Sequence, residues 1–232
     1  MENAHKDAPR EANFLLARPE RALLTWLAKR LPARVQPDHL TALALVAAVG
    51  IAVAYLLSNR DPAWLWAASA LLAIHWFGDS LDGSLARYRK IERPRYGFYL
   101  DHLADAFATA MIGLGLGLSP YMLLSVGLVI VIGYLMLSIN VYLETHVFNR
   151  FSLGYGKIGP TEARLALITL NVTLALGIGL DFKVEGLGLT VLDVIGLIGA
   201  GAMGAMLATR AAKNLRELAI DEPSARQLER LA

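Results

Sequence analysis

Four aspartates lie in or at the ends of long apolar runs within residues 79–105. Asp79 and Asp82 are three residues apart, and Asp101 and Asp105 are four residues apart. At helical spacing each pair projects from one face, so two packed helices would bring four carboxylates together. An ionised carboxylate at membrane depth costs about 2.5–3.5 kcal/mol, and four of them repel one another unless cations hold them. Because hard divalent cations prefer carboxylate oxygens, the pattern predicts a site for one or two Mg²⁺ ions.

The aspartates belong to a longer pattern with fixed spacing, Asp79-x2-Asp82-Gly83-x2-Ala86-Arg87-x9-Gly97-x3-Asp101-x3-Asp105. The pattern resembles the signature of the CDP-alcohol phosphotransferase family (CDP-alcohol phosphatidyltransferases), over about 27 residues. The resemblance implies a membrane enzyme of phospholipid biosynthesis that requires Mg²⁺ or Mn²⁺. Such an enzyme transfers a phosphoalcohol from a CDP-linked donor to an alcohol acceptor and releases CMP.

The resemblance also assigns roles to the acidic residues. Asp79, Asp82 and Asp101 are the expected metal ligands, and two ions held by them would grip the pyrophosphate of the donor. Asp105 is either a fourth ligand or the base that takes the proton of the acceptor hydroxyl. His102 is the other candidate base, because histidine titrates closer to neutral pH than aspartate does. At about 100° per residue His102 points away from the face that Asp101 and Asp105 share, which favours Asp105.

The small residues of the motif are expected to make room for the donor. Gly83 and Gly97 would let a nucleotide approach the helix backbone, and Ala86 would clear further space. Arg87 would pair with a phosphate or with a ligand carboxylate. For the other glycine-rich runs, at 113–117 and 199–205, helix packing is the better interpretation.

A second short motif begins the first apolar segment. The run Pro37-Asp38-His39-Leu40-Thr41 resembles the family's Pro-Asn-x-x-Thr, with aspartate at the usual asparagine position. The resemblance places Thr41 and Asp38 beside the cytidine. Asp38 as an N-cap of the following helix is an equally good explanation.

Two polar stretches are similar to the acceptor-side segments of choline and ethanolamine phosphotransferases and their prokaryotic relatives. In the first, Asn140 and Glu144 are four residues apart, and His146 follows. In the second, Glu162 and Arg164 open the fifth apolar segment. The resemblance makes all five candidates for binding the acceptor alcohol. Charge complementarity at a helix start explains Glu162 and Arg164 equally well.

The composition is that of a membrane protein. Of 232 residues, 56% are hydrophobic and 18% are charged. We predict an all-α polytopic fold with three regions: a cytosolic N-terminus (1–36), a catalytic domain of six transmembrane helices (37–212) and a cytosolic tail (213–232). The N-terminal region should hold one interfacial amphipathic helix over 11–31, bent near Pro19. The six expected spans are 38–58, 63–86, 97–118, 120–146, 161–181 and 187–210.

The placement of charge predicts the orientation. All lysines and arginines except Arg60 and Lys183 fall on one side of the six spans. By the positive-inside rule both termini and the aspartates face the cytoplasm. We therefore expect an integral protein of the cell membrane of a prokaryote, homodimeric by family resemblance. The net charge of +2 gives no support for a nucleic-acid partner, and the lack of cysteine excludes disulfides.

Some alternatives stay open at this point. The aspartates could instead pair with Arg87 and its neighbours, or line the ion path of a transporter or cation channel. An inactive scaffold is disfavoured because the motif is complete. For an enzyme, the donor is either CDP-diacylglycerol, used with a polar acceptor such as inositol phosphate, glycerol phosphate or serine, or a CDP-linked polar alcohol, used with diacylglycerol.

Overall fold

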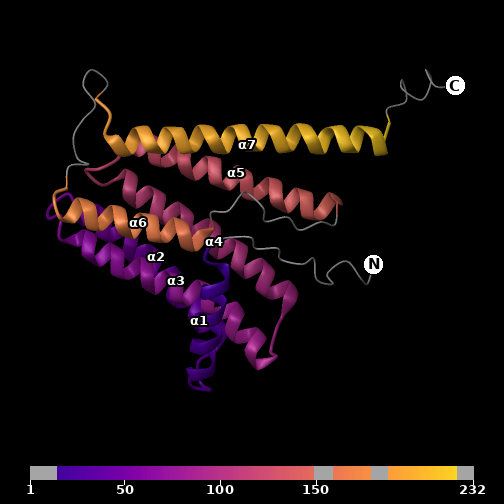
Figure 1. Ribbon diagram of the computed structural model, residues 1–232, viewed down its shortest axis with the longest axis horizontal. Helices are drawn as coiled ribbons and strands as arrows, with labels where there is room; N and C mark the ends of the chain where they lie inside the picture. Colours follow the sequence, from indigo (N-terminus) through magenta and orange to yellow (C-terminus); the bar gives the residue numbers. More distant parts are fainter. Residues whose placement is uncertain (1–14, 149–158, 179–187, 224–232) are drawn as a thin grey trace.

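The computed structural model describes residues 15–148, 159–178 and 188–223. Within these ranges it contains seven α-helices and no strand, so the all-α prediction is confirmed (Figure 1). Every predicted span overlaps one helix, and the predicted interfacial helix corresponds to the first, although residues 11–14 lie outside the described ranges. The helices are α1 (Ala17–Arg30), α2 (Pro37–Leu57), α3 (Trp64–Arg89), α4 (Pro94–Gly117), α5 (Leu124–Phe148), α6 (Pro160–Ala175) and α7 (Val191–Asp221).

Local sequence signals set most helix boundaries. Pro37, Pro94 and Pro160 each occupy the first helical turn, where the missing N–H of proline leaves no hydrogen bond broken. α3 ends where Lys90 adopts a left-handed conformation with φ of 57°. Thr190 caps α7 by accepting a hydrogen bond from the N–H of Asp193 at 3.1 Å.

The helices pack in a continuous series. α2 contacts both α3 and α4, α6 lies on α3, and α5 connects α4 with α7 (Figure 1). Leu174 of α6 and Leu192 of α7 join a core made mainly by α2, α3 and the start of α5. α1 runs across the direction of α2 and α3, and contacts the last turns of α3. The largest buried residues of the main core are Ile51, Tyr55, Leu65 and Leu72.

Glycines allow the closest helix contacts. A Cβ on Gly78 of α3 would lie 2.5 Å from the carbonyl oxygen of Leu40, and one on Gly115 of α4 would lie 2.5 Å from Cα of Ala52. The packing interpretation therefore holds for the run at 113–117. At 199–205 a Cβ on Gly199, Gly201 or Gly204 would meet no atom of a described residue within 4 Å, so contacts inside the described part of the chain do not account for this run.

Three of the described helices are long and apolar enough to cross a membrane by length and composition: α2, α5 and α7. α3 and α4 carry the aspartates and several arginines, and α6 has only 16 described residues. The charges of α3 and α4 and the short described length of α6 explain why these helices are not among those long and apolar enough to cross a membrane. α7 is one continuous helix of 31 residues, about 46 Å at 1.5 Å per residue. The tail predicted from residue 213 therefore begins as an extension of the last helix.

Two details differ from the sequence prediction. α1 begins two residues before Pro19, so this proline lies in the first turn and does not bend the helix. The start of α7 is tied to Leu123, the residue just before α5, by Asp193, which the sequence analysis did not single out. Asp193 is fully buried, and its carboxylate accepts hydrogen bonds from the backbone N–H of Leu123 at 2.7 Å and of Thr190 at 2.8 Å.

Candidate active site

The fold brings the four motif aspartates together on facing sides of α3 and α4. Asp79 and Asp82 lie in the last three turns of α3, and Asp101 and Asp105 lie in the first half of α4. Asp82 interacts electrostatically with Asp79 and Asp101. Asp105 interacts electrostatically with the same two residues. The helical spacing of the motif therefore produces one acidic cluster, as the sequence predicted.

Two of these carboxylates have well-defined hydrogen-bond donors. Nη2 of Arg164, from the first turns of α6, lies 2.6 Å from Oδ2 of Asp79. The hydroxyl of Thr41, from α2, donates to Oδ2 of Asp82 at 2.6 Å, and the N–H of Gly83 donates to Oδ1 at 2.5 Å. Helices α2, α3, α4 and α6 thus all contribute to the cluster. Thr41 and Arg164, from segments far apart in the sequence, belong to it directly.

A divalent cation suits the chemistry of this cluster, since its members are carboxylates. As the side chains stand, no group of three or more His, Asp or Glu residues in the described ranges is arranged so that it could hold a metal ion. The oxygens of Asp79 and Asp82 are engaged by Arg164, Thr41 and a backbone N–H instead. Binding a cation therefore requires these side chains to exchange partners, and the assignment of ligands stays a prediction.

The motif glycines differ from the packing glycines. A Cβ on Gly97 would meet nothing within 4 Å, and one on Gly83 would come no closer than 3.4 Å to a protein atom, Nη1 of Arg87. Helix packing thus explains neither residue. The exposed Arg87 side chain donates to the hydroxyl of Ser84 at 3.2 Å, and Ala86 is half-buried one turn after Asp82.

Asp38 connects two helix starts. Its two carboxylate oxygens lie 2.5 and 2.7 Å from Nη2 of Arg93, and its Oδ2 accepts from the hydroxyl of Tyr96 at 3.5 Å. The hydrogen bond to Asp38 raises the pKa of Arg93 above its usual value. The N-cap of α2 is Gln36, with Asp38 two positions further on, so the N-cap explanation of Asp38 is wrong.

His102 lies against aromatic side chains. Its Nδ1 is 2.7 Å from the carbonyl oxygen of Phe98 and 3.7 Å from Oδ2 of Asp101. Its ring centre is 4.1 Å from that of Phe98 and 4.9 Å from that of Tyr142 on α5. The imidazole is therefore held at the edge of the acidic cluster, between α4 and α5.

The first acceptor-side candidate group forms a separate polar cluster between α5 and α7. Glu144 is only 7% exposed and accepts hydrogen bonds from Asn140 at 2.7 Å and from Asn214 at 2.6 Å. It also forms an ion pair with Arg210 at 2.5 Å. His146 is exposed, two residues further along α5. Asn140 and Glu144 are thus engaged with α7.

The two residues of the second acceptor-side pair, Glu162 and Arg164, contact different parts of the structure. Arg164 joins the acidic cluster, whereas Glu162 serves the starts of two helices. Its carboxylate accepts from the N–H of Gly159, the N-cap of α6, and from the N–H of Leu16, the N-cap of α1, both at 2.9 Å. Helix-start complementarity therefore describes the contacts of Glu162 but not those of Arg164.

Two polar residues beside the cluster were missed by the sequence analysis. Glu20 of α1 accepts from Nε1 of Trp76 at 2.8 Å and from the hydroxyl of Thr161 at 2.6 Å, which fixes α1 to α3 and α6. His75 is 2% exposed and interacts electrostatically with Asp79 and Arg164. Its position, four residues before Asp79 on the same helix face, was the available signal.

Comparison with known proteins agrees with this site. Residues 34–205 match the family model described as CDP-alcohol phosphatidyltransferase, and this range includes all four aspartates, Thr41 and Arg164. The chain belongs to the CDP-alcohol phosphatidyltransferase family. Members of this family generally depend on divalent cations.

Two curated proteins are similar in sequence to this chain. It is 28% identical over 191 residues to cholinephosphotransferase 1 of Danio rerio, a match that covers 75% of this chain and 48% of that protein. It is 36% identical over 89 residues to phosphatidylinositol phosphate synthase of Cutibacterium acnes, covering 38% of this chain and 40% of that protein. Each match spans less than half of the relative's length. Neither relative is a transporter or channel, so that alternative gains no support.

Proposed function

We propose that the protein transfers a phosphoalcohol from a CDP-linked donor to an alcohol acceptor and releases CMP, as a step of phospholipid biosynthesis. The observation that carries the proposal is the meeting of four carboxylates from α3 and α4 with Thr41 and Arg164. Family membership supports the same reaction class. A structural ion-pair network would not need four mutually repelling acids with one arginine between them.

The aspartates Asp79, Asp82 and Asp101 would hold Mg²⁺ or Mn²⁺, in our proposal two ions, which would neutralise the pyrophosphate and favour CMP as leaving group. Thr41 holds the carboxylate of Asp82 in place. Asp105 takes the proton of the acceptor hydroxyl as its oxygen attacks the phosphorus next to CMP. The new P–O bond forms as the bond to CMP breaks, and CMP leaves with the bonding electrons.

The substrates approach the cluster from two sides in this proposal. Gly83, Ala86 and Gly97 leave the backbone open to the donor nucleotide, and Arg87 pairs with a donor phosphate. Asp38, at the start of α2, lies on the cytidine side. Arg164 is the favoured acceptor-side residue, because its guanidinium reaches Asp79 and presents several donors in a planar fork.

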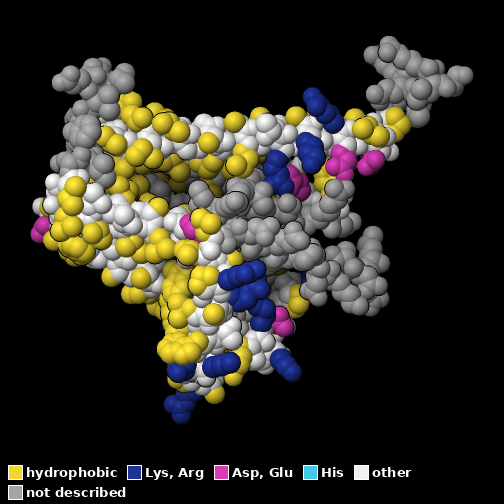
Figure 2. Space-filling view, in the orientation of Figure 1, with side chains coloured by type: hydrophobic (Ala, Val, Ile, Leu, Met, Phe, Trp, Pro, Cys, Tyr) yellow, Lys and Arg dark blue, Asp and Glu magenta, His cyan; other side chains and the backbone are white. Residues whose placement is uncertain are grey.

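The membrane arrangement is also a proposal. Six helices, α2 to α7, would cross the bilayer within a catalytic domain of residues 37–212, with residues 1–36 and 213–232 on the cytoplasmic side. Figure 2 supports this polarity, because Lys and Arg gather over α1 and the C-terminal half of α7, whereas hydrophobic side chains cover the opposite end. We further propose a homodimer, as the family resemblance implies.

Matched donor and acceptor pairs test the function. The purified protein in phosphatidylcholine vesicles with Mg²⁺ is given CDP-diacylglycerol with inositol phosphate, glycerol phosphate or serine, or else CDP-choline or CDP-ethanolamine with diacylglycerol. We expect CMP release that requires both the donor and one acceptor class. The two relatives differ in class by name, so both classes must be assayed. Cation flux through the vesicles without CMP release from any pair would overturn the proposal.

A further inference from the structure

Helix α1 is fixed to the bundle by one face. Leu24 and Ala28 are buried against the last turns of α3. Glu20, on the same side, accepts hydrogen bonds from Trp76 and Thr161. At about 100° per residue the remaining circumference of α1 is left facing away from the other helices.

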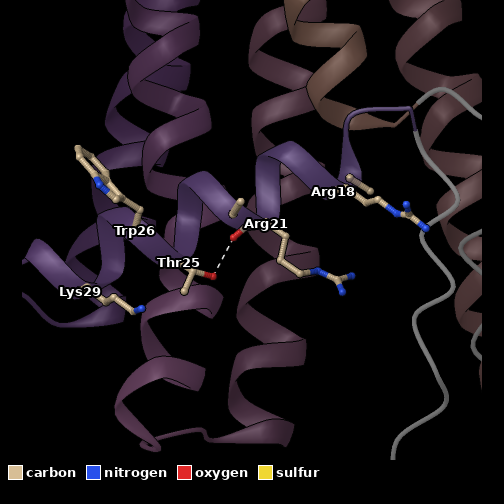
Figure 3. A pocket seen from close by; sticks show the side chains of 7 residues that line it. Arg18, Arg21, Thr25, Trp26 and Lys29 are labelled. Carbon is tan, nitrogen blue, oxygen red and sulfur yellow. Dashed lines mark hydrogen bonds between the residues drawn. The ribbon is translucent and has the colours of Figure 1, made fainter.

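A shallow hollow of about 600 Å³ lies along a neighbouring face of α1 (Figure 3). Arg18, Arg21 and Lys29 line it, and all three side chains are exposed. Thr25 lies between them, with its hydroxyl donating to the carbonyl oxygen of Arg21 at 2.8 Å. Within the described ranges none of the three cations forms an ion pair. Among the described residues, no carboxylate neutralises the positive charge of the hollow.

The third face of α1 is apolar and exposed. Leu23 is 45% and Trp26 is 49% exposed, and Leu15, just before the helix, is 71% exposed. The guanidinium of Arg30 lies over the ring of Trp26, 3.7 Å from the ring centre. Going around the helix at about 100° per residue, the apolar face borders Lys29 and Arg18, and Arg21 lies beyond Arg18. Trp26 belongs to the apolar face and also lines the hollow. A helix with this arrangement lies in the membrane interface, with its apolar side chains among the acyl chains and its cations at phosphate depth.

We propose that the hollow on α1 binds the phosphate of an anionic phospholipid of the surrounding bilayer. A lipid fits better than a soluble anion, because the exposed apolar face beside the hollow would contact the acyl chains of the same molecule. The site does not depend on the catalytic proposal. The hollow is nevertheless connected physically to the acidic cluster. Glu20 ties α1 to Thr161, and Arg164 in the next turn of α6 contacts Asp79.

Lipid contact at the hollow can be measured without any assay of activity. The chain has no cysteine, so Ala22→Cys, in the lining of the hollow, gives a single site for a bimane label. The labelled full-length protein is placed in phosphatidylcholine vesicles that contain equal fractions of brominated phosphatidylglycerol or brominated phosphatidylcholine. We expect phosphatidylglycerol to quench at least about fivefold more effectively, the preference that one cation near a membrane surface supplies. Raising NaCl from about 0.05 to about 0.5 M should reduce that preference.

Charge-neutral variants then test the assigned residues. Combining Arg18→Gln, Arg21→Gln and Lys29→Gln should bring the quenching ratio close to one, and each single change should lower it partway. The matched control is Lys213→Gln with Arg216→Gln, which removes exposed cations from α7 and should leave the ratio unchanged. A ratio near one in the parent protein, an equal loss in the control, or displacement by an excess of inorganic phosphate or CDP would overturn the proposal.

Discussion

Arg164 and Asp79 form an ion pair at 2.6 Å that joins the start of α6 to the acidic face of α3. Their side chains are only 11% and 18% exposed, so the pair is largely shielded from water. One guanidinium thereby compensates part of the repulsion among four carboxylates. The contact also gives α6 a direct place in the proposed site.

Loss of this guanidinium should impair catalysis and also cost stability, because Asp79 would be left largely buried without its partner. We expect Arg164→Gln to lower the rate of CMP release by about 10²-fold, because Asp79 and the acceptor would both lose the side chain that positions them. Arg164→Lys should recover only part of the rate, because ammonium lacks the planar fork. Turnover and KM are measured beside a melting curve.

Arg210→Gln is the control: it breaks the buried pair with Glu144 and should cost about 3–5 kcal/mol of stability with the rate per folded molecule retained. The reverse pattern would assign the chemistry to α5 and α7.

The acidic cluster should respond as one unit. Asp79→Asn, Asp82→Asn and Asp101→Asn should each abolish CMP release while the protein still folds, because each removes a charged ligand without changing side-chain size. In the absence of metal Asp82→Asn and Asp101→Asn should be equally stable or more so, since one repelling charge is gone. Asp79→Asn should be less stable, because it breaks the largely buried ion pair with Arg164. Rates at increasing Mg²⁺ and Mn²⁺ concentrations check this. Substantial Mg²⁺-dependent turnover in any one variant would exclude the shared cation site.

Two glycines on neighbouring helices should give opposite results on substitution by alanine. Gly97→Ala should leave the melting temperature unchanged or raise it slightly, because its Cβ meets open space and alanine favours the helix, but should raise the KM for the CDP-linked donor. Gly78→Ala should destabilise the protein by about 1–3 kcal/mol, because its Cβ would be forced onto the backbone of α2. The KM for the donor and the melting temperature are measured for both variants to test this prediction. A Gly97→Ala protein with an unchanged KM would remove this glycine from the donor site.

The proposed base should be distinguished from its neighbour by single-turnover kinetics. We expect Asp105→Asn to slow the chemical step by about 10²–10⁴-fold, with donor and metal binding retained. His102→Ala should have a milder effect, because the imidazole is packed between Phe98 and Tyr142. Rates are taken across pH at saturating Mg²⁺. An inactive His102→Ala protein beside an active Asp105→Asn protein would reverse the assignment.

The orientation in the membrane can be checked by labelling single cysteines. Cysteines at Lys90 and Lys213 should react with an impermeant reagent from the cytoplasmic side, and one at Lys183 should react only from the other side. Labelling is carried out on intact cells and on inverted vesicles. Reaction of the Lys90 and Lys183 positions from the same side would contradict the arrangement with six spans.

The sequence alone determined the elements of this protein and the residues of its central motif. Apolar runs of membrane length, with proline at helix starts and short polar breaks between them, are local signals, and each predicted span overlaps a helix. The spacing of Asp79, Asp82, Asp101 and Asp105 is likewise local to two helices, so their meeting needed only that α3 and α4 both pack against α2.

The tertiary structure decided which distant side chains become partners. Arg164 contacts Asp79 across 85 positions of sequence, and Asp38 contacts Arg93 across 55. Glu144 is held by Arg210 of α7 instead of lining the acidic cluster. The sequence left the roles of these residues open, because a charged side chain near a helix end can satisfy a cap, a neighbour or a ligand at similar cost. The packing of α6 on α3, and of α7 on α5, sets which of those partners comes within hydrogen-bond distance.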